Sequence, residues 1–238
     1  MATAAPEIKA PPRKFFMSLR DLSFWARSSR ADSLLKKIRR EHGNEGAFDK
    51  LYEELRDPWN TNVPYYRYQL LKYQTILSFL PRRPYGRALD IGCGLGVLTR
   101  LMAPHAEHIL GVDVSQCAID AATRLSGEMK GVSFQRADLL HFPPESAGQY
   151  DLVIVIDTLY YLTPLTEELL ERARKGLTDL LAPDGILLLV NHYYFGFDRL
   201  SRESREIHSS FGAAPGLCLV SEHRKPFYLA SVLERTSS

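Results

Sequence analysis

Three glycines that follow an aspartate in the sequence are the residues whose spacing points most directly to chemistry. Asp90 ends an apolar stretch, and glycines stand at alternate positions after it: Gly92, Gly94 and Gly96. Glycines at a strand-to-helix turn let the backbone approach a ligand closely, and the amides that open the next helix point toward that ligand. The loop, which also contains Cys93, is therefore expected to hold a nucleotide-like cofactor. A tight turn without a ligand is the alternative.

The acid at position 90 bears on which cofactor to expect. A dinucleotide fold presents helix amides to a pyrophosphate, which Asp90 would repel. The glycines follow G-x-G-x-G, whereas the dinucleotide fingerprint is G-x-G-x-x-G, and Val97 stands where its last glycine would be. A ligand with an ammonium and a sulfonium but no phosphate fits better. S-adenosylmethionine carries those groups, so it is the expected cofactor.

A second acid, Asp113, ends the apolar stretch 108–114 and lies 23 residues after Asp90. A carboxylate at this position can accept both ribose hydroxyls of a nucleoside. The alternative is that Asp113 caps the helix that begins near Ser115, although Ser115 can fill that role itself. We therefore expect Asp113, with its neighbour Val114, to contact the cofactor.

Two further acids follow predicted strands. Asp138, next to Leu139, follows the stretch 132–137 and could accept a hydrogen bond from an adenine amino group. Asp157 follows 150–156, which is apolar on both faces as in a central parallel strand. In open α/β sheets, ligands bind at the carboxyl ends of the strands, so the four acids are expected to converge on one crevice.

The elements that must position these residues alternate along the chain. Helices are expected over 96–104, 115–127 and 164–181, and further strands over 108–114, 132–137, 150–156 and 185–192. Residues 217–235 contain two apolar runs around Pro226 and predict a closing antiparallel hairpin. With 238 residues of which 45% are hydrophobic, the chain predicts one doubly wound, Rossmann-like α/β domain with a mostly parallel seven-stranded sheet.

The N-terminal part differs in charge. Residues 1–40 carry ten Lys and Arg against three acids, a net +7, and the remainder carries −5. We expect residues 1–50 to be a basic, partly disordered or helical extension, and 51–238 to be the catalytic domain with a helical lid over 51–80. Residues 13–40 could dock weakly on anionic lipid or a protein partner, but a helix packed on the domain is favoured. No extended aromatic and basic platform indicates nucleic acid.

The remaining composition excludes several classes of protein. The three cysteines, Cys93, Cys117 and Cys218, lack metal-ligand spacing, so neither a metal site nor a disulfide framework is expected. No apolar run approaches the roughly 20 residues that span a bilayer, and the amino terminus has no secretory pattern. A soluble protein of the reducing cytoplasm is the expectation.

Together these motifs resemble the class I S-adenosylmethionine-dependent methyltransferases over roughly residues 65–192. They are Asp90-x-Gly92-x-Gly94-x-Gly96, Asp113, Ala137-Asp138 and Tyr150-Asp151-Leu152-Val153. Flanking stretches are similar to the nodulation protein S type: Asp57-Pro58-Trp59, residues 68–77, Leu80-Pro81 and Leu159-Tyr160-Tyr161-Leu162. Gln69 stands where that type commonly has Glu, and the first fifty residues and those after Tyr193 show no counterpart.

The resemblance implies roles for further residues. Members of this type methylate the nitrogen of a deacetylated glucosamine unit in a chitooligosaccharide. A helix carrying Tyr68 and Lys72 would cover the cofactor as a lid, with Lys72 pairing with the cofactor carboxylate. An exposed lysine on an amphipathic helix is the equal alternative.

The expected function is methylation of an amino or hydroxyl group on a sugar, oligosaccharide or related small natural product. Four side chains at the crevice mouth are candidate catalytic residues: Asp157, Tyr160, Tyr161 and His192. Asp157 could instead bind the cofactor ammonium, the two tyrosines could be core aromatics, and His192 could be a structural histidine. The acceptor pocket is expected to draw on the lid and on residues 193–214. A catalytically inactive binding module is the alternative function, and a nicotinamide-dependent oxidoreductase is disfavoured.

Overall fold

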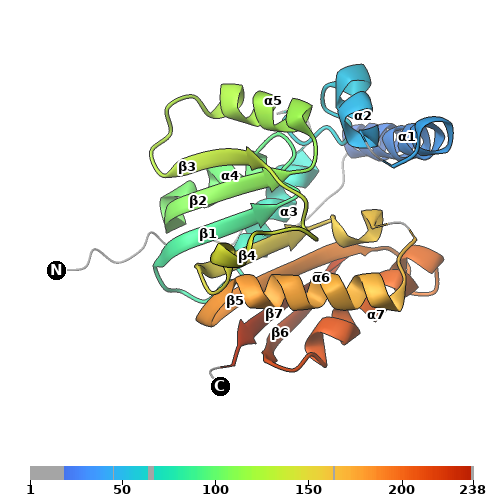
Figure 1. Cartoon of the computed structure of the whole chain (residues 1–238). Coiled ribbons are helices and arrows are strands. Elements are labelled where there is room, and N and C mark those ends of the chain that lie inside the picture. The colour runs from blue at the N-terminus through green and yellow to red at the C-terminus, as the bar shows by residue number, and fades with distance from the viewer. Residues whose placement is uncertain (1–18, 45, 64–66, 163, 237–238) are drawn as a thin grey trace.

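A computed structural model describes residues 19–44, 46–63, 67–162 and 164–236; the start of the chain, predicted to be partly disordered, lies outside these ranges. The described residues form a seven-stranded sheet in the order β3-β2-β1-β4-β5-β7-β6 (Figure 1). Its strands are β1 Tyr85–Ile91, β2 Ala106–Asp113, β3 Val132–Arg136, β4 Tyr150–Ile156, β5 Leu181–Tyr193, β6 Leu217–Lys225 and β7 Phe227–Arg235. The first five are parallel, and β7 runs antiparallel to β5 and β6. The predicted doubly wound sheet with a closing hairpin is confirmed.

Helices cover both faces of this sheet. Helices α6 (Glu167–Leu180) and α7 (Arg199–Gly212) pack on one face, and α6 crosses the front of the sheet in Figure 1. Helices α3 (Arg67–Leu77) and α4 (Val97–Met102) pack on the other, while α5 (Gln116–Ser126) lies against β2 and β3. Successive residues of β4 serve the two cores: Val153 faces α6, and Leu152 and Ile154 face α3 and α4. This alternation explains why the strand is apolar throughout.

Two N-terminal helices, α1 (Leu19–His42) and α2 (Ala47–Leu55), lie beyond the carboxyl ends of the strands (Figure 1). Leu35 and Ile38 of α1 are buried against α2. Asp49 of α2 then accepts hydrogen bonds from the start of α5, from Ser115 Oγ at 2.6 Å and from the Cys117 amide at 3.2 Å. Helix α2 also spans residue 50, where the sequence predicted a boundary between extension and domain.

Several element ends differ from the sequence prediction for local reasons. Helix α6 begins after Thr166, whose hydroxyl caps it by accepting a hydrogen bond from the Leu169 amide. Within residues 193–214, which were expected to contribute to the acceptor pocket, Arg199–Gly212 form α7, which Asp198 caps through the Ser201 amide. Its buried residues, including Phe211, pack against the sheet instead of lining a pocket. In the described part of the chain, no helix has the length and apolar character that a membrane span requires.

Candidate active site

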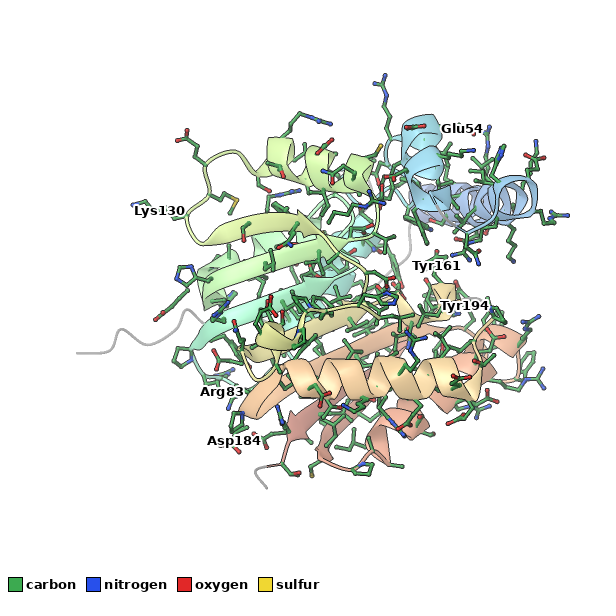
Figure 2. All side chains as sticks on the ribbon, viewed as in Figure 1. Glu54, Arg83, Lys130, Tyr161, Asp184 and Tyr194 are labelled. Carbon is green, nitrogen blue, oxygen red and sulfur yellow. The ribbon has the colours of Figure 1, made fainter. Side chains whose placement is uncertain are left out.

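One cavity opens at the carboxyl ends of the strands, between the sheet and the N-terminal helices. Figure 2 shows Tyr161 and Tyr194 at this end of the sheet and Arg83 and Asp184 at the other. Most of the predicted site residues line the cavity: Tyr68, Lys72, Gly92, Cys93, Gly94, Asp113, Val114, Asp138, Leu139, Asp157, Tyr160, Tyr161 and His192. The exceptions are Asp90 and Gly96. The predicted convergence therefore brings together residues from β1, β2, β3, β4, β5 and α3.

The first two glycines form the part of the loop that faces the cavity. Gly92 has a φ of +73°, and a Cβ there would lie 2.3 Å from Thr158 Oγ1. Gly94 has a φ of +52°, and a Cβ there would lie 2.9 Å from the Tyr52 hydroxyl oxygen. Side chains are thus excluded at both positions by conformation and by space. The backbone itself becomes the cavity wall.

Gly96 has a different purpose from the one predicted. It precedes α4 with a φ of +68°, and a Cβ would lie 2.6 Å from the ring of Phe134 on β3. The residue is therefore required for packing α4 and α5 against the sheet, and it does not line the cavity.

Asp90 also differs from its predicted role as a cofactor contact. Its side chain is buried, and its carboxylate accepts a hydrogen bond from Thr99 Oγ1 at 2.6 Å, within α4. Burial raises the pKa of this carboxyl to about 7. Asp90 thus anchors α4, the helix that follows the glycine loop, and does not itself line the cavity.

Asp113 lines the cavity and also binds two backbone amides. Its Oδ1 accepts from the Ser115 amide and its Oδ2 accepts from the Gly94 amide, both at 3.0 Å, while the side chain still lines the cavity. Ser115 itself caps α5 through the Ala118 amide. Burial raises the pKa of Asp113, and the two amide contacts oppose this effect. The residue ties the glycine loop to the start of α5.

Asp138 is more exposed than the other acids in the wall. Its carboxylate accepts from the Leu140 amide at 2.9 Å and contacts His141 Nδ1 at 2.8 Å. These contacts fix the turn that follows β3.

Lys72 and Asp157 form an ion pair across the cavity, with the Lys72 ammonium donating to Asp157 Oδ2. The Lys72 side chain is only 5% exposed, so the alternative of an exposed helix lysine is wrong. Asp157 adopts a φ of +52°, unusual for a residue other than glycine. Its second oxygen, Oδ1, is buried and has no hydrogen-bond partner among the described residues. A buried carboxylate oxygen without a partner is unusual in a folded protein.

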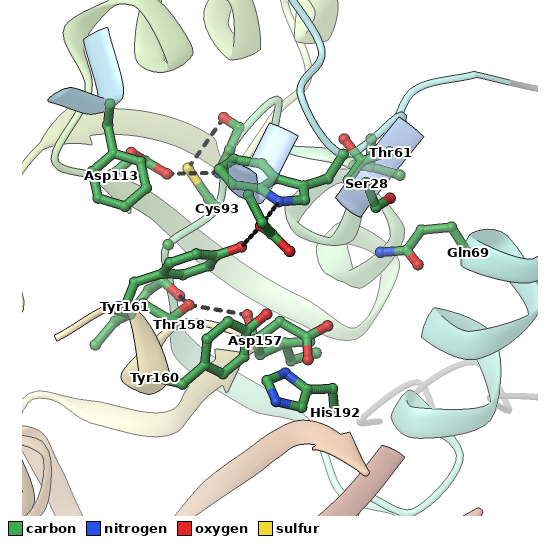
Figure 3. A pocket seen from close by; sticks show the side chains of 18 of the residues that line it. Ser28, Thr61, Gln69, Cys93, Asp113, Asp157, Thr158, Tyr160, Tyr161 and His192 are labelled. Atoms are coloured by element: carbon green, nitrogen blue, oxygen red, sulfur yellow. Dashed lines mark hydrogen bonds between the residues drawn. The ribbon is translucent and has the colours of Figure 1, made fainter. Parts of the chain in front are cut away.

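His192 lies at the end of β5 among aromatic rings. The Tyr160 ring centroid is 4.1 Å away and the Tyr194 centroid 5.4 Å. Burial lowers the pKa of His192, so the imidazole is neutral at pH 7. Its Nε2 is buried and lacks a hydrogen-bond partner within the described residues. Figure 3 shows Asp157, Tyr160 and His192 grouped on one side of the pocket.

The sequence did not single out the contribution of α1. Ser28 and Asp32 from this helix line the cavity. Asp32 Oδ1 accepts from the Tyr161 hydroxyl at 2.8 Å and from Trp59 Nε1 at 3.1 Å. The sequence marks Asp32 only as an acid among the basic residues of this helix. That signal is weak, because charged side chains on a helix are usually solvated.

Residues 43–221 match the family model described as "Nodulation protein S (NodS)". The chain belongs to the nodulation protein S family. The match extends beyond the stretch of recognised motifs on both sides, and includes residues before 50 and after Tyr193 where no counterpart was seen. Helix α1 lies outside the matched residues.

Individual members of the family are moderately similar to this chain. Nodulation protein S of Bradyrhizobium diazoefficiens is 31% identical over 133 residues, which cover 56% of this chain and 61% of that protein. That of Rhizobium tropici is 32% identical over 133 residues, covering 56% and 53%. The chain thus spans less than two thirds of the length of these relatives. Magnesium-protoporphyrin O-methyltransferase of Rhodobacter capsulatus is 28% identical over 225 residues, covering 88% of both chains.

The fold is shared with a solved structure of the family. The N-methyltransferase NodS from Bradyrhizobium japonicum WM9, in complex with S-adenosyl-L-homocysteine, superposes with a TM-score of 0.66. The two chains are 21% identical, and the match covers 86% of this chain and 99% of the other. This similarity establishes the methyltransferase fold.

Proposed function

We propose that this protein is an S-adenosylmethionine-dependent methyltransferase that acts on an amino or hydroxyl group of a saccharide or related small molecule. The observation that carries the proposal is the one cavity that Gly92, Gly94, Asp113, Asp157 and His192 line together. The similar proteins include enzymes named as N- and O-methyltransferases, one of them solved with S-adenosyl-L-homocysteine.

The residues present fit this cofactor. The glycine loop offers bare backbone where side chains would clash, and Asp113 in the adjacent wall can accept ribose hydroxyls. Asp138 and Leu139 line the part of the wall suited to the base. The buried, unpartnered Oδ1 of Asp157 suits an ammonium, and the neighbouring Lys72 suits a carboxylate. When bound, the cofactor supplies an electrophilic methyl group, whose S–CH₃ bond breaks as the bond to the acceptor forms.

The chain's own residues would orient the acceptor and receive its proton. Much of the acceleration of an in-line displacement comes from holding the two reacting atoms in line. An acceptor nitrogen must be neutral to attack, and a hydroxyl must lose its proton. His192 lines the cavity with a neutral imidazole, and its Nε2, which has no hydrogen-bond partner among the described residues, is the candidate to take that proton. Tyr160 and Tyr194 hold the imidazole in place.

Calorimetry with S-adenosylhomocysteine tests the proposal, with NADH as the control ligand. We expect S-adenosylhomocysteine to bind and NADH not to bind. No heat at millimolar S-adenosylhomocysteine would contradict the proposal. Binding without methyl transfer to any member of an amine and alcohol library would instead favour an inactive binding module.

We further propose that α1, α2 and α3 act as a lid over the cavity and that the protein works in the cytoplasm. The lid is supported by the cavity residues that these helices supply, such as Asp32, Tyr52 and Lys72. A reducing compartment suits the free thiols of Cys93, Cys117 and Cys218.

A further inference from the structure

The cavity wall contains a carboxylate from outside the family match. Asp32 lies on α1, whereas the family match begins at residue 43. Two neutral donors, Trp59 Nε1 and the Tyr161 hydroxyl, fix its Oδ1. Among the described residues, no donor contacts its Oδ2, and no Lys or Arg lies within ion-pair distance of the side chain. Two hydrogen bonds therefore hold the carboxylate in place, and it has no ion-pair partner among the described residues.

The other acid on this side of the cavity is balanced. Asp157 is paired with Lys72, and His192 carries no charge at neutral pH because burial lowers its pKa. Of these two acids, Asp32 is therefore the one without an ion-pair partner among the described residues, while the Arg39 guanidinium donates to the Tyr161 carbonyl oxygen and lies over the Phe48 ring. Its negative charge also acts to raise the pKa of His192, against the larger effect of burial, so its field reaches the expected reaction centre.

Aromatic rings surround this charge. The Trp59 centroid is 5.6 Å from that of Tyr161 and 6.4 Å from that of Phe48, and all three side chains line the cavity. Figure 3 shows Tyr161 turned toward the middle of the pocket, with its hydroxyl in a drawn hydrogen bond. A carboxylate without an ion-pair partner beside aromatic faces attracts cations, because ion pairing and the electron-rich ring faces act together.

We propose that Asp32 is a specificity-determining residue that selects acceptors bearing an ammonium group. The proposal rests on the proposed methyltransferase function and specifies which acceptors that function serves. The carboxylate binds the ammonium while the rings of Trp59 and Tyr161 contact its aliphatic or sugar surroundings. Helix α1 thereby gives this chain an acceptor contact that residues 43–221 alone do not supply.

A matched pair of small probes tests the proposal without knowledge of the natural acceptor. Benzylammonium and benzyl alcohol have similar shapes but differ in charge at pH 7. Their binding to the protein saturated with S-adenosylhomocysteine can be followed by ligand-observed NMR. We expect the full chain to bind benzylammonium about 10-fold or more tightly than benzyl alcohol, as a charge-assisted contact predicts.

Two charge-neutralising variants separate recognition from folding. Asp32→Asn keeps an oxygen that can accept from Trp59 and Tyr161, so it removes the charge and little else. Glu41→Gln removes the same charge from an exposed position of the same helix. We expect Asp32→Asn to abolish the preference for benzylammonium and Glu41→Gln to retain it, with the melting temperature and the S-adenosylhomocysteine affinity unchanged in both.

Equal binding of the two probes to the wild-type protein would overturn the proposal, as would a preference that survives in Asp32→Asn. Either result leaves cofactor binding untouched, so failure of this inference is distinct from failure of the proposed function. Loss of S-adenosylhomocysteine binding in the wild-type protein would refute the proposed function itself.

Discussion

Lys72 on α3 and Asp157 after β4 are 85 positions apart in the sequence, yet they form an ion pair inside the candidate active site. The pair links the helix that covers the cavity to the sheet that forms its floor. It also leaves one oxygen of Asp157 for a further donor. We therefore expect the pair to contribute to the stability of the fold as well as to the binding site.

Breaking this pair from one side should be costly. Lys72→Met leaves an unpaired carboxylate, and Asp157→Asn leaves a buried ammonium. Removing one partner of a buried pair costs about 3–5 kcal/mol, and the partial exposure of Asp157 places each variant nearer about 2–3 kcal/mol. The double variant should lose less than the sum of the singles by about 1–3 kcal/mol. Urea unfolding of the wild type, the two single variants and the double variant measures these losses in the free energy of unfolding. Additive losses would show that the two residues do not interact.

His192 should control turnover and leave cofactor affinity unchanged. We expect His192→Gln to lower kcat by about 100-fold or more, the usual scale for a lost general base. Because burial lowers the pKa of His192, its neutral form prevails above about pH 6.5, and wild-type kcat should fall only as the pH drops below that value. His108→Gln, at an exposed position on β2, is the control. Unchanged turnover of His192→Gln from pH 6 to 9 would eliminate the role.

Gly96 and Gly148 offer a comparison between two glycines with the same φ of +68°. Alanine at Gly148 meets no atom within 4 Å, so it should cost only the left-handed conformation, about 1–2 kcal/mol. Alanine at Gly96 also meets the ring of Phe134, and overpacking adds about 1–3 kcal/mol. Thermal unfolding of the two variants measures the difference. Equal losses would mean that α4 and β3 are less tightly packed than described.

Asp90 should make the protein less stable at alkaline pH. Its folded pKa of about 7 lies above its unfolded value, so the folded state binds more protons between these values. The stability that this group contributes is fully present below about pH 4 and is lost as the pH rises through 7. Asp90→Asn should therefore match the wild type near pH 4.

At pH 9 the same variant should be more stable than the wild type by up to about 4 kcal/mol, which is the free energy equivalent of the raised pKa. Chemical unfolding at several pH values measures the trend. Glu107→Gln, an exposed change on β2, should show no such gain. A constant difference between Asp90→Asn and wild type at all pH values would show that burial does not perturb this carboxyl.

The order of elements and the end of the sheet where acids gather could be predicted because both follow from periodicity and topology. Asp138 and Asp157 lie just past β3 and β4, and Asp113 is the last residue of β2, so their side chains reach the cavity. Asp90 does not reach it because β1 continues to Ile91. The alternation of strand side chains then turns Asp90 toward α4. Asp113 ends its strand and lines the cavity, whereas Asp90 stands one residue before the end of its strand and does not.

Pairings across the cavity could not be predicted, since sequence spacing does not tell which charged groups meet. Lys72 was expected to face a cofactor and was found against Asp157. Asp32 was hidden among the basic residues of α1, and its contacts with Trp59 and Tyr161 depend on how that helix packs.

The position of α1 has a practical consequence for work on this protein. A shortened protein that begins at residue 43 would keep every strand, the glycine loop and the contact from Asp49 to α5. Such a protein would lack Ser28 and Asp32 and the buried contact of Leu35 and Ile38 with α2. Compound collections screened against it would then report on a site with one wall removed, so searches for the natural acceptor need a protein that includes α1.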